Sequence, residues 1–112
     1  MNCLKSQIDQ FGMDKKVILS SVATKDLQDS HQWYEDRSEG LGVRFVDVIN
    51  KTIEFILLNP EGYPEKSPPY REIALEKFPY LIIYEFDKAN NIVYILHIFH
   101  TKRNPKQKYK RK

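Results

Sequence analysis

Residues 80–100 read YLIIYEFDKANNIVYILHIFH, and this stretch decides the fold. Strands are expected from Tyr80 to Asp87 and from Ile92 to His100, because both runs are rich in β-branched and aromatic residues. Lys88 to Asn91, with its Asn-Asn pair, is expected to be the turn between them. The second strand is apolar on both faces, so it is expected to lie inside the sheet. The first alternates, with one face formed by Tyr80, Ile82, Tyr84 and Phe86.

The residues before this hairpin complete a single domain. Strands are expected from Lys16 to Ser21 and, after the proline-rich loop 60–69, from Tyr70 to Leu75. Two amphipathic helices lie between them, one capped by Thr24 and running to about Ser38, the other running from about Leu41 to Leu58. Their apolar stripes are Ala23, Leu27, Ser30 and Tyr34, and Leu41, Phe45, Val48, Ile49, Thr52, Ile53 and Ile56. The predicted fold class is α+β, in the order β-α-α-β-β-β, with a helical hairpin packed on a largely antiparallel four-stranded sheet.

Length and composition fit one globular domain in a reducing compartment. The chain has 112 residues, of which 41% are hydrophobic, and its only cysteine is Cys3. The longest apolar runs, such as Val93 to Phe99, are too short to span a bilayer, so a cytoplasmic protein is expected. We divide the chain into an N-terminal extension at 1–12, a domain at 13–109 and the end of a basic tail at 110–112. The extension is either a short helix or an upstream start that the core does not need.

Positive charge is concentrated at the C-terminus. The last twelve residues contain seven of the 18 Lys and Arg residues and no acid, which leaves 11 basic and 15 acidic residues in the rest of the chain. Such a tail is typical of a binding site for nucleic acid or an acidic partner, or it is a solvated terminus. The candidate binding residues are Lys102, Arg103, Lys106, Lys108, Lys110, Arg111 and Lys112, together with Arg71.

Residues 94–109, YILHIFHTKRNPKQKY, hold the candidate catalytic groups. Cleavage of RNA by its own 2′-OH needs a base, a cation and an acid but no metal, and His100, Arg103 and Tyr109 could supply them. Arg71 could add a phosphate clamp. The simpler alternatives are a strand cap for His100, packing of the tail for Tyr109 and an ion pair for Arg71. No metal-binding or cofactor-binding signature is present, so neither ligand is expected.

The order of several short motifs resembles the RelE/ParE superfamily of type II toxin–antitoxin toxins over residues 13–109. The matching pieces are the helix start at 23–27, Trp33-Tyr34, Gly40-Leu41-Gly42 with Phe45, Asn59-Pro60, Tyr70-Arg71, Phe78-Pro79-Tyr80, Ile83-Tyr84, and His100 with Lys102-Arg103-Asn104-Pro105. The resemblance implies a compact toxin that an antitoxin neutralises in a hetero-oligomer.

The superfamily divides by target. RelE-like members cut mRNA in the ribosome and often use a C-terminal Tyr, for which Tyr109 and the basic Arg103 are the matching residues. ParE-like members poison DNA gyrase. Leu81 stands where the nuclease branch often has Arg, and the strand around Glu72 is acidic, so the ParE-like side is favoured. The alternatives are a ribosome-dependent mRNA endonuclease and a degenerate member that only binds a partner.

Overall fold

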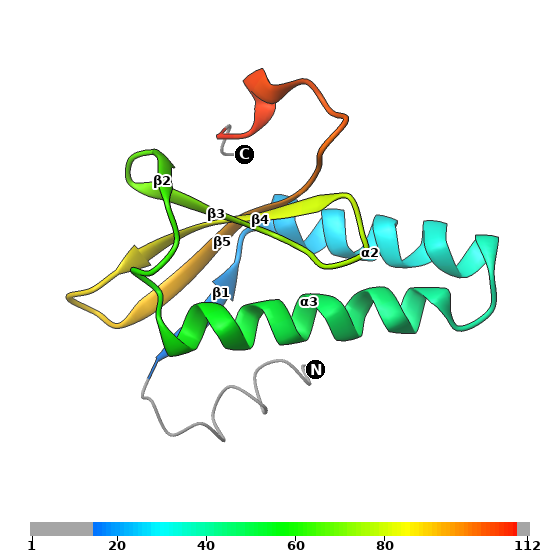
Figure 1. The fold of residues 1–112 in the computed structure, drawn as a ribbon, viewed down its shortest axis with the longest axis horizontal. Helices are drawn as coiled ribbons and strands as arrows, with labels where there is room; N and C mark the ends of the chain where they lie inside the picture. The colour runs from blue at the N-terminus through cyan, green and yellow to red at the C-terminus, as the bar shows by residue number, and fades with distance from the viewer. Residues whose placement is uncertain (1–14, 110–112) are drawn as a thin grey trace.

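The computed structural model describes residues 15–109 as a sheet with a helical hairpin on one face (Figure 1). The elements are β1 (Lys16–Leu19), α2 (Ser21–Arg37), α3 (Leu41–Leu58), β2 (Glu65–Ser67), β3 (Tyr70–Ala74), β4 (Tyr80–Asp87), β5 (Ile92–His100) and the 3-10 helix η1 (Pro105–Gln107). The predicted α+β class and helical hairpin are confirmed. The expected extension at 1–12 and tail end at 110–112 lie outside the described residues. Neither helix of residues 15–109 is long and apolar enough to cross a bilayer.

The sheet has five strands in the order β1-β5-β4-β3-β2, so the predicted count of four is wrong. The additional strand is β2, which pairs with β3 inside the segment expected to be a loop. Its three residues are polar and flanked by prolines, so neither propensity nor periodicity marks it. β1 runs parallel to β5, and the other pairs are antiparallel. β5 lies inside the sheet, as predicted.

The first helix begins earlier than predicted. Ser20, not Thr24, is the N-cap of α2, because its hydroxyl oxygen accepts the N–H of Ala23 at 2.9 Å. The same hydroxyl donates to the carbonyl of Leu96 in β5 at 2.7 Å. Thr24 lies inside the helix, where its hydroxyl donates to the Ser20 carbonyl at 3.0 Å. Ser20 therefore joins the end of β1, the start of α2 and the sheet.

A carboxylate closes the turn between the two helices. Gly40 has φ 86°, in the left-handed region that favours glycine. The Glu35 carboxylate accepts the N–H groups of Gly40 and Gly42, each at 2.9 Å. These hydrogen bonds hold the pKa of Glu35 below its usual value. Because two N–H groups at the start of α3 need partners, Glu35 serves as their cap from the preceding helix.

The main core lies between the helical hairpin and the sheet. The predicted face of β4 points into it, with Tyr80, Ile82 and Tyr84 buried against Phe45 and its neighbours in α3. The hydroxyl of Tyr84 donates to the carbonyl of Pro60 at 2.7 Å and fixes the end of α3 to the sheet. A second, smaller apolar cluster lies on the opposite face of the sheet and consists of Ile83, Leu96 and Phe99.

A β-bulge decides which face of the sheet each residue near the end of β5 occupies. Ile83 of β4 pairs with His97 and the next residue, Tyr84, pairs with Ile95, so Leu96 is the extra residue. Strict alternation from Ile95 would place His97 and Phe99 on the helical face. The extra residue instead moves Ile98 and His100 to that face and turns Phe99 to the other.

Candidate functional site

The residues that follow β5, 101–109, form the C-terminal segment, which turns back over the sheet as the red ribbon in Figure 1. Three hydrogen bonds shape the turn. The Thr101 N–H donates to the Pro79 carbonyl at 2.9 Å, the Arg103 N–H donates to the His100 carbonyl at 3.0 Å, and the Asn104 side chain accepts the Lys106 N–H at 3.0 Å. Asn104 thereby caps η1, which begins at Pro105. The described part of the basic tail thus has a defined conformation.

Glu72 of β3 holds the far end of the C-terminal segment. Its side chain accepts the hydroxyl of Tyr109 and pairs with the Lys108 ammonium at 3.3 Å. Tyr109 also stacks on Tyr70, with 5.6 Å between ring centres, and packs on the apolar cluster around Ile83. Burial and the neighbouring carboxylate raise the pKa of Tyr109. Glu72 itself is only 8% exposed.

Asp26 of α2 holds the near end. One of its carboxylate oxygens accepts the N–H of Ile98 at 3.1 Å and lies 3.4 Å from Nδ1 of His97. The other lies 3.5 Å from the guanidinium of Arg103, which also sits 5.0 Å from the ring centre of Phe99. β1 ends opposite Ile95, so the edge of β5 beyond that point is free for Asp26 to approach. Asp26 therefore couples the first helix, the sheet and the C-terminal segment.

His100 lies on the helical face of the sheet. It pairs with Tyr80 across the strands, and their rings meet edge to face at 4.9 Å. Its Nδ1 accepts the Lys102 N–H at 3.0 Å, so it caps the strand end. The ring lines a cavity of about 540 Å³ that is also lined by Trp33 and Tyr34 of α2.

Arg71 binds the loop 61–65, which precedes its own strand. Its guanidinium donates to the carbonyls of Tyr63 at 2.7 Å and Glu61 at 3.1 Å, and lies 3.4 Å from the Glu65 carboxylate. These contacts occupy the donors that a phosphate clamp would use.

The four candidate catalytic residues do not converge. His100 lies on the helical face of the sheet, whereas Tyr109 lies on the opposite face. Arg103 lies beside Asp26, and Arg71 is engaged by the loop 61–65. The expectation that the end of the sheet presents His100, Arg103 and Tyr109 to a single substrate is therefore not met.

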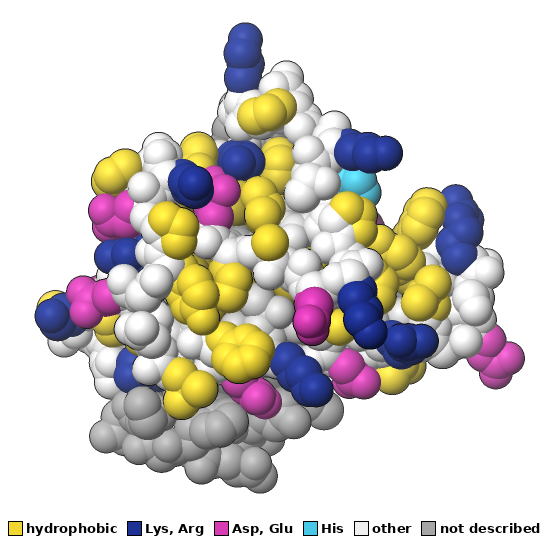
Figure 2. Space-filling model, viewed as in Figure 1, with side chains coloured by type: hydrophobic (Ala, Val, Ile, Leu, Met, Phe, Trp, Pro, Cys, Tyr) yellow, Lys and Arg dark blue, Asp and Glu magenta, His cyan; other side chains and the backbone are white. Residues whose placement is uncertain are grey.

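The candidate binding residues divide into engaged and free cations. Arg71, Arg103 and Lys108 each pair with a carboxylate. Lys102 and Lys106 are exposed and form no ion pair within residues 15–109. Lys110, Arg111 and Lys112 lie outside the described residues. Figure 2 shows Lys and Arg side chains projecting from the part of the molecule where the C-terminal segment lies.

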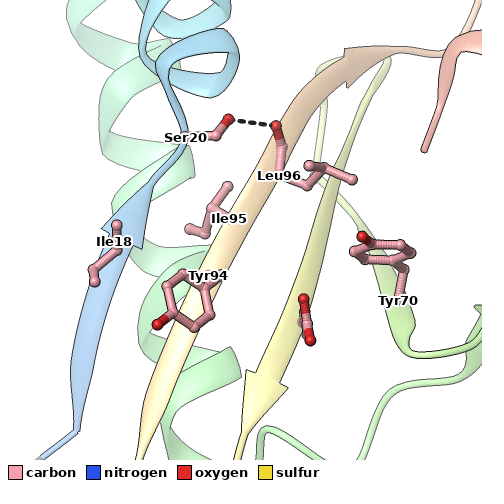
Figure 3. A pocket seen from close by; sticks show the side chains of 7 residues that line it. Ile18, Ser20, Tyr70, Tyr94, Ile95 and Leu96 are labelled. Carbon is pink, nitrogen blue, oxygen red and sulfur yellow. Dashed lines mark hydrogen bonds between the residues drawn. The ribbon is translucent and has the colours of Figure 1, made fainter. Parts of the chain in front are cut away.

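Next to the C-terminal segment, the open face of the sheet carries a groove of about 320 Å³, here called the sheet groove (Figure 3). Ile18 of β1 and Tyr94 of β5 line it and are 43% and 37% exposed. Tyr70 borders both the groove and the stacked ring of Tyr109. The remaining lining residues are Ser20, Glu85, Ile95 and Leu96. The groove and the C-terminal segment together form one continuous side of the protein.

Sequence reasoning missed the roles of Asp26 and Glu72. Both acids pair with residues far along the chain, Asp26 with Arg103 and Glu72 with Lys108. The sequence does contain a signal for the role of Glu72. It is the only acid on its face of the strand 70–74, the face shared with Leu81 and Ile83, and an acid on an apolar face needs a partner, which the basic tail offers. Within residues 15–109, no group of three or more His, Cys, Asp or Glu side chains could hold a metal ion.

Comparison with known proteins identifies the family. A solved structure described as the chromosomal ParDE TA system from P. aeruginosa superposes with a TM-score of 0.64 and 19% identity, covering 80% of this chain and 99% of that one. At this identity the likeness supports the fold. No curated protein matches the chain. The family model for the ParE toxin of the type II toxin–antitoxin system, parDE, matches residues 17–105. The chain therefore belongs to the ParE toxin family of type II toxin–antitoxin systems.

Proposed function

We propose that this type II toxin stops growth by poisoning DNA gyrase in the cytoplasm, through contacts made by the open face of the sheet and the C-terminal segment. The observation that carries the proposal is the separation of His100 from Tyr109 by the sheet. Acid–base cleavage needs groups within hydrogen-bond reach of one phosphate, and these two groups face different sides. Binding to a macromolecular target needs only an accessible surface, which the free lysines and the sheet groove provide.

The state of Tyr109 also disfavours the alternative of an mRNA endonuclease. Its hydroxyl donates to Glu72, so the proton is directed into the protein. Burial and the carboxylate raise the pKa of Tyr109, which makes the phenol a poorer acid for a leaving 5′-oxygen.

We further propose that a cognate antitoxin covers the sheet groove in a toxin–antitoxin hetero-oligomer. The family pairs each toxin with an antitoxin, and the structural neighbour is described as a toxin–antitoxin system. Exposed Ile18 and Tyr94 offer apolar anchors, and β1 is the edge strand beside them. An extended segment laid along such an edge gains main-chain hydrogen bonds and side-chain pockets together.

A cleavage assay with purified gyrase tests the target. Gyrase, supercoiled plasmid, ATP and the toxin are incubated, stopped with detergent and protease, and the plasmid is examined for double-strand breaks. We expect linear DNA that depends on both gyrase and toxin. Toxin saturated with its antitoxin is the matched control and should give none.

Expression in growing cells separates the alternatives. Gyrase poisoning predicts induction of the SOS response with unchanged mRNA 5′ ends. In-frame cuts within translated codons, lost in Tyr109→Phe or Arg103→Ala, would instead identify the endonuclease. Unaffected growth without the antitoxin would identify a member that only binds a partner.

A further inference from the structure

We propose that Asp26 and Glu72 are positioning residues that hold the C-terminal segment as a preformed surface for the phosphodiester backbone of duplex DNA. This inference deepens the gyrase proposal and rests on it, because the DNA would be the segment that gyrase holds. It assigns a role to two acidic residues that lie outside the candidate catalytic set.

The two carboxylates act at opposite ends of the segment. Asp26 pairs with Arg103 just after β5, and Glu72 pairs with Lys108 and accepts the hydroxyl of Tyr109 at the other end. Both acids are largely buried, with side-chain exposures of 14% for Asp26 and 7% for Glu72. A segment fixed at both ends loses little conformational entropy when it binds, which is the advantage of a preformed surface.

Between these anchors the segment keeps two positive charges for a ligand. The carboxylates neutralise Arg103 and Lys108, whereas exposed Lys102 and Lys106 form no ion pair within residues 15–109. The backbone between them is shaped by hydrogen bonds, with the Gln107 N–H donating to the Asn104 carbonyl at 2.9 Å. The two lysines therefore project from an ordered turn.

The composition of the segment favours a phosphate backbone over a protein partner. Residues 101–108 read TKRNPKQK, with no acid and no aromatic or aliphatic anchor apart from Pro105. Protein interfaces depend on apolar and aromatic anchors and are depleted in lysine. Contacts to DNA phosphates are made by Lys, Arg, Thr, Asn and Gln, which are the residue types present here.

The pairing of Glu72 with the C-terminal segment also compensates the negative charge of β3. Glu72 is buried beneath Lys108 and Tyr109, so its charge is compensated before any phosphate approaches. Glu72 therefore anchors the basic surface.

The salt dependence of DNA binding tests the surface itself. A fluorescent 30-base-pair duplex is titrated with the intact toxin at several salt concentrations, and affinity is read from anisotropy. For the double variant Lys102→Gln, Lys106→Gln, we expect the slope of log affinity against log salt to fall by about two, at roughly 0.9 per phosphate contact. The matched control is Lys51→Gln, Lys88→Gln, which loses the same charge from α3 and the β4–β5 turn and should keep the wild-type slope.

Glu72→Gln tests the positioning role, because a net-charge effect and a positioning effect predict changes of opposite sign in the affinity for DNA. Removing a negative charge strengthens DNA binding if only net charge matters. If Glu72 positions the segment, the variant binds DNA about fivefold more weakly, since a charge-assisted anchor is lost. Limited trypsin digestion reports directly whether the C-terminal segment is released from the sheet, through faster cleavage after Lys102, Arg103 and Lys106. Circular dichroism checks that the fold of the variant remains.

Each result decides the inference. Weaker binding by Glu72→Gln with faster cleavage in the segment supports it, whereas tighter or unchanged binding overturns it. A change in affinity for gyrase alone, without one for DNA, would assign the lysines to a protein contact and overturn it as well. A preference for single-stranded RNA over the duplex would overturn the choice of DNA. DNA binding that behaves as expected, without gyrase-dependent breaks, would reject the gyrase proposal separately.

Discussion

The hydroxyl of Tyr84 joins two elements, β4 and the end of α3, through one hydrogen bond. Its ring is fully buried, and it donates to the Pro60 carbonyl at the end of α3. Tyr84→Phe would leave that buried carbonyl without its donor, at a cost of about 1–3 kcal/mol in the free energy of unfolding. Urea denaturation followed by fluorescence measures the change. Tyr94→Phe is the control, because Tyr94 is 37% exposed, and an equal loss there would contradict the role of the buried bond.

Ionisation of Tyr109 makes the stability of the protein fall as pH rises in the alkaline range. Its pKa is raised in the folded protein by burial and by Glu72, so folding favours the protonated phenol. The stabilisation is complete below the pKa of an unfolded tyrosine, about 10, and is lost as pH rises towards the folded value. Tyr109→Phe cannot ionise, so the stability difference between it and the wild type should shrink between pH 9 and 11. A constant difference across thermal melts in this range would contradict the assignment.

The residue scale is also where prediction from sequence was weakest. The choice between Ser20 and Thr24 as the N-cap depended on a partner 76 positions away, the carbonyl of Leu96. A serine and a threonine are both good caps, so local preference could not decide between them. The buried roles of Asp26 and Glu72 have the same origin, because each acid is partnered by residues far along the chain.

At the scale of elements, the two helices approach each other closely at Gly42. A Cβ there would lie 2.7 Å from the His31 carbonyl oxygen and 2.8 Å from the Glu35 carboxylate. The backbone carbonyl cannot rotate away, so Gly42→Ala must separate α2 from α3 and should cost about 1–3 kcal/mol. Val43→Ala, at an exposed neighbouring position, is the control for chemical denaturation. If the two variants were equally stable, close approach would not be what requires glycine.

The same helical turn gives a prediction at acidic pH. Hydrogen bonds from Gly40 and Gly42 lower the pKa of Glu35 in the folded state. The resulting stabilisation is present above the unfolded pKa, about 4.3, and is lost as pH falls through the folded value. Glu35→Gln should therefore lower the melting temperature at pH 7, and the difference from wild type should narrow below pH 4. Glu39→Gln, at an exposed site in the same turn, is the control that removes a carboxylate without removing the hydrogen bonds to Gly40 and Gly42.

The order of the elements other than β2 was predictable, because each of them has a pattern visible in the local sequence. The alternation in β4, the helical stripe through Phe45 and the Gly40 turn are each visible in a short window. The bulge at Leu96 was not, because β5 is apolar on both faces and either register buries suitable side chains. That one extra residue sets the face on which His100 lies, so the geometry of the candidate site could not follow from the sequence pattern.

For the whole molecule, the open side of the sheet combines two surfaces with different chemistry. The sheet groove is apolar and aromatic at Ile18 and Tyr94, whereas the C-terminal segment is polar and basic. They meet at Tyr70, which lines the groove and stacks on Tyr109. A partner on the groove is therefore adjacent to the proposed DNA surface. This arrangement gives one physical basis for neutralisation, since an antitoxin seated there could exclude the DNA.

Two variants should separate neutralisation from target binding. Tyr94→Asp places a charge in the sheet groove and should weaken antitoxin binding by tenfold or more, about the weight of one buried aromatic anchor, without changing affinity for duplex DNA. The double variant Lys102→Gln, Lys106→Gln should weaken binding to duplex DNA without changing affinity for the antitoxin, because the sheet groove is untouched. Calorimetry with the antitoxin and anisotropy with the duplex measure both affinities for each variant. Loss of both affinities in either variant, with the fold intact, would mean that antitoxin and DNA use a single shared surface, because independent contacts change independently.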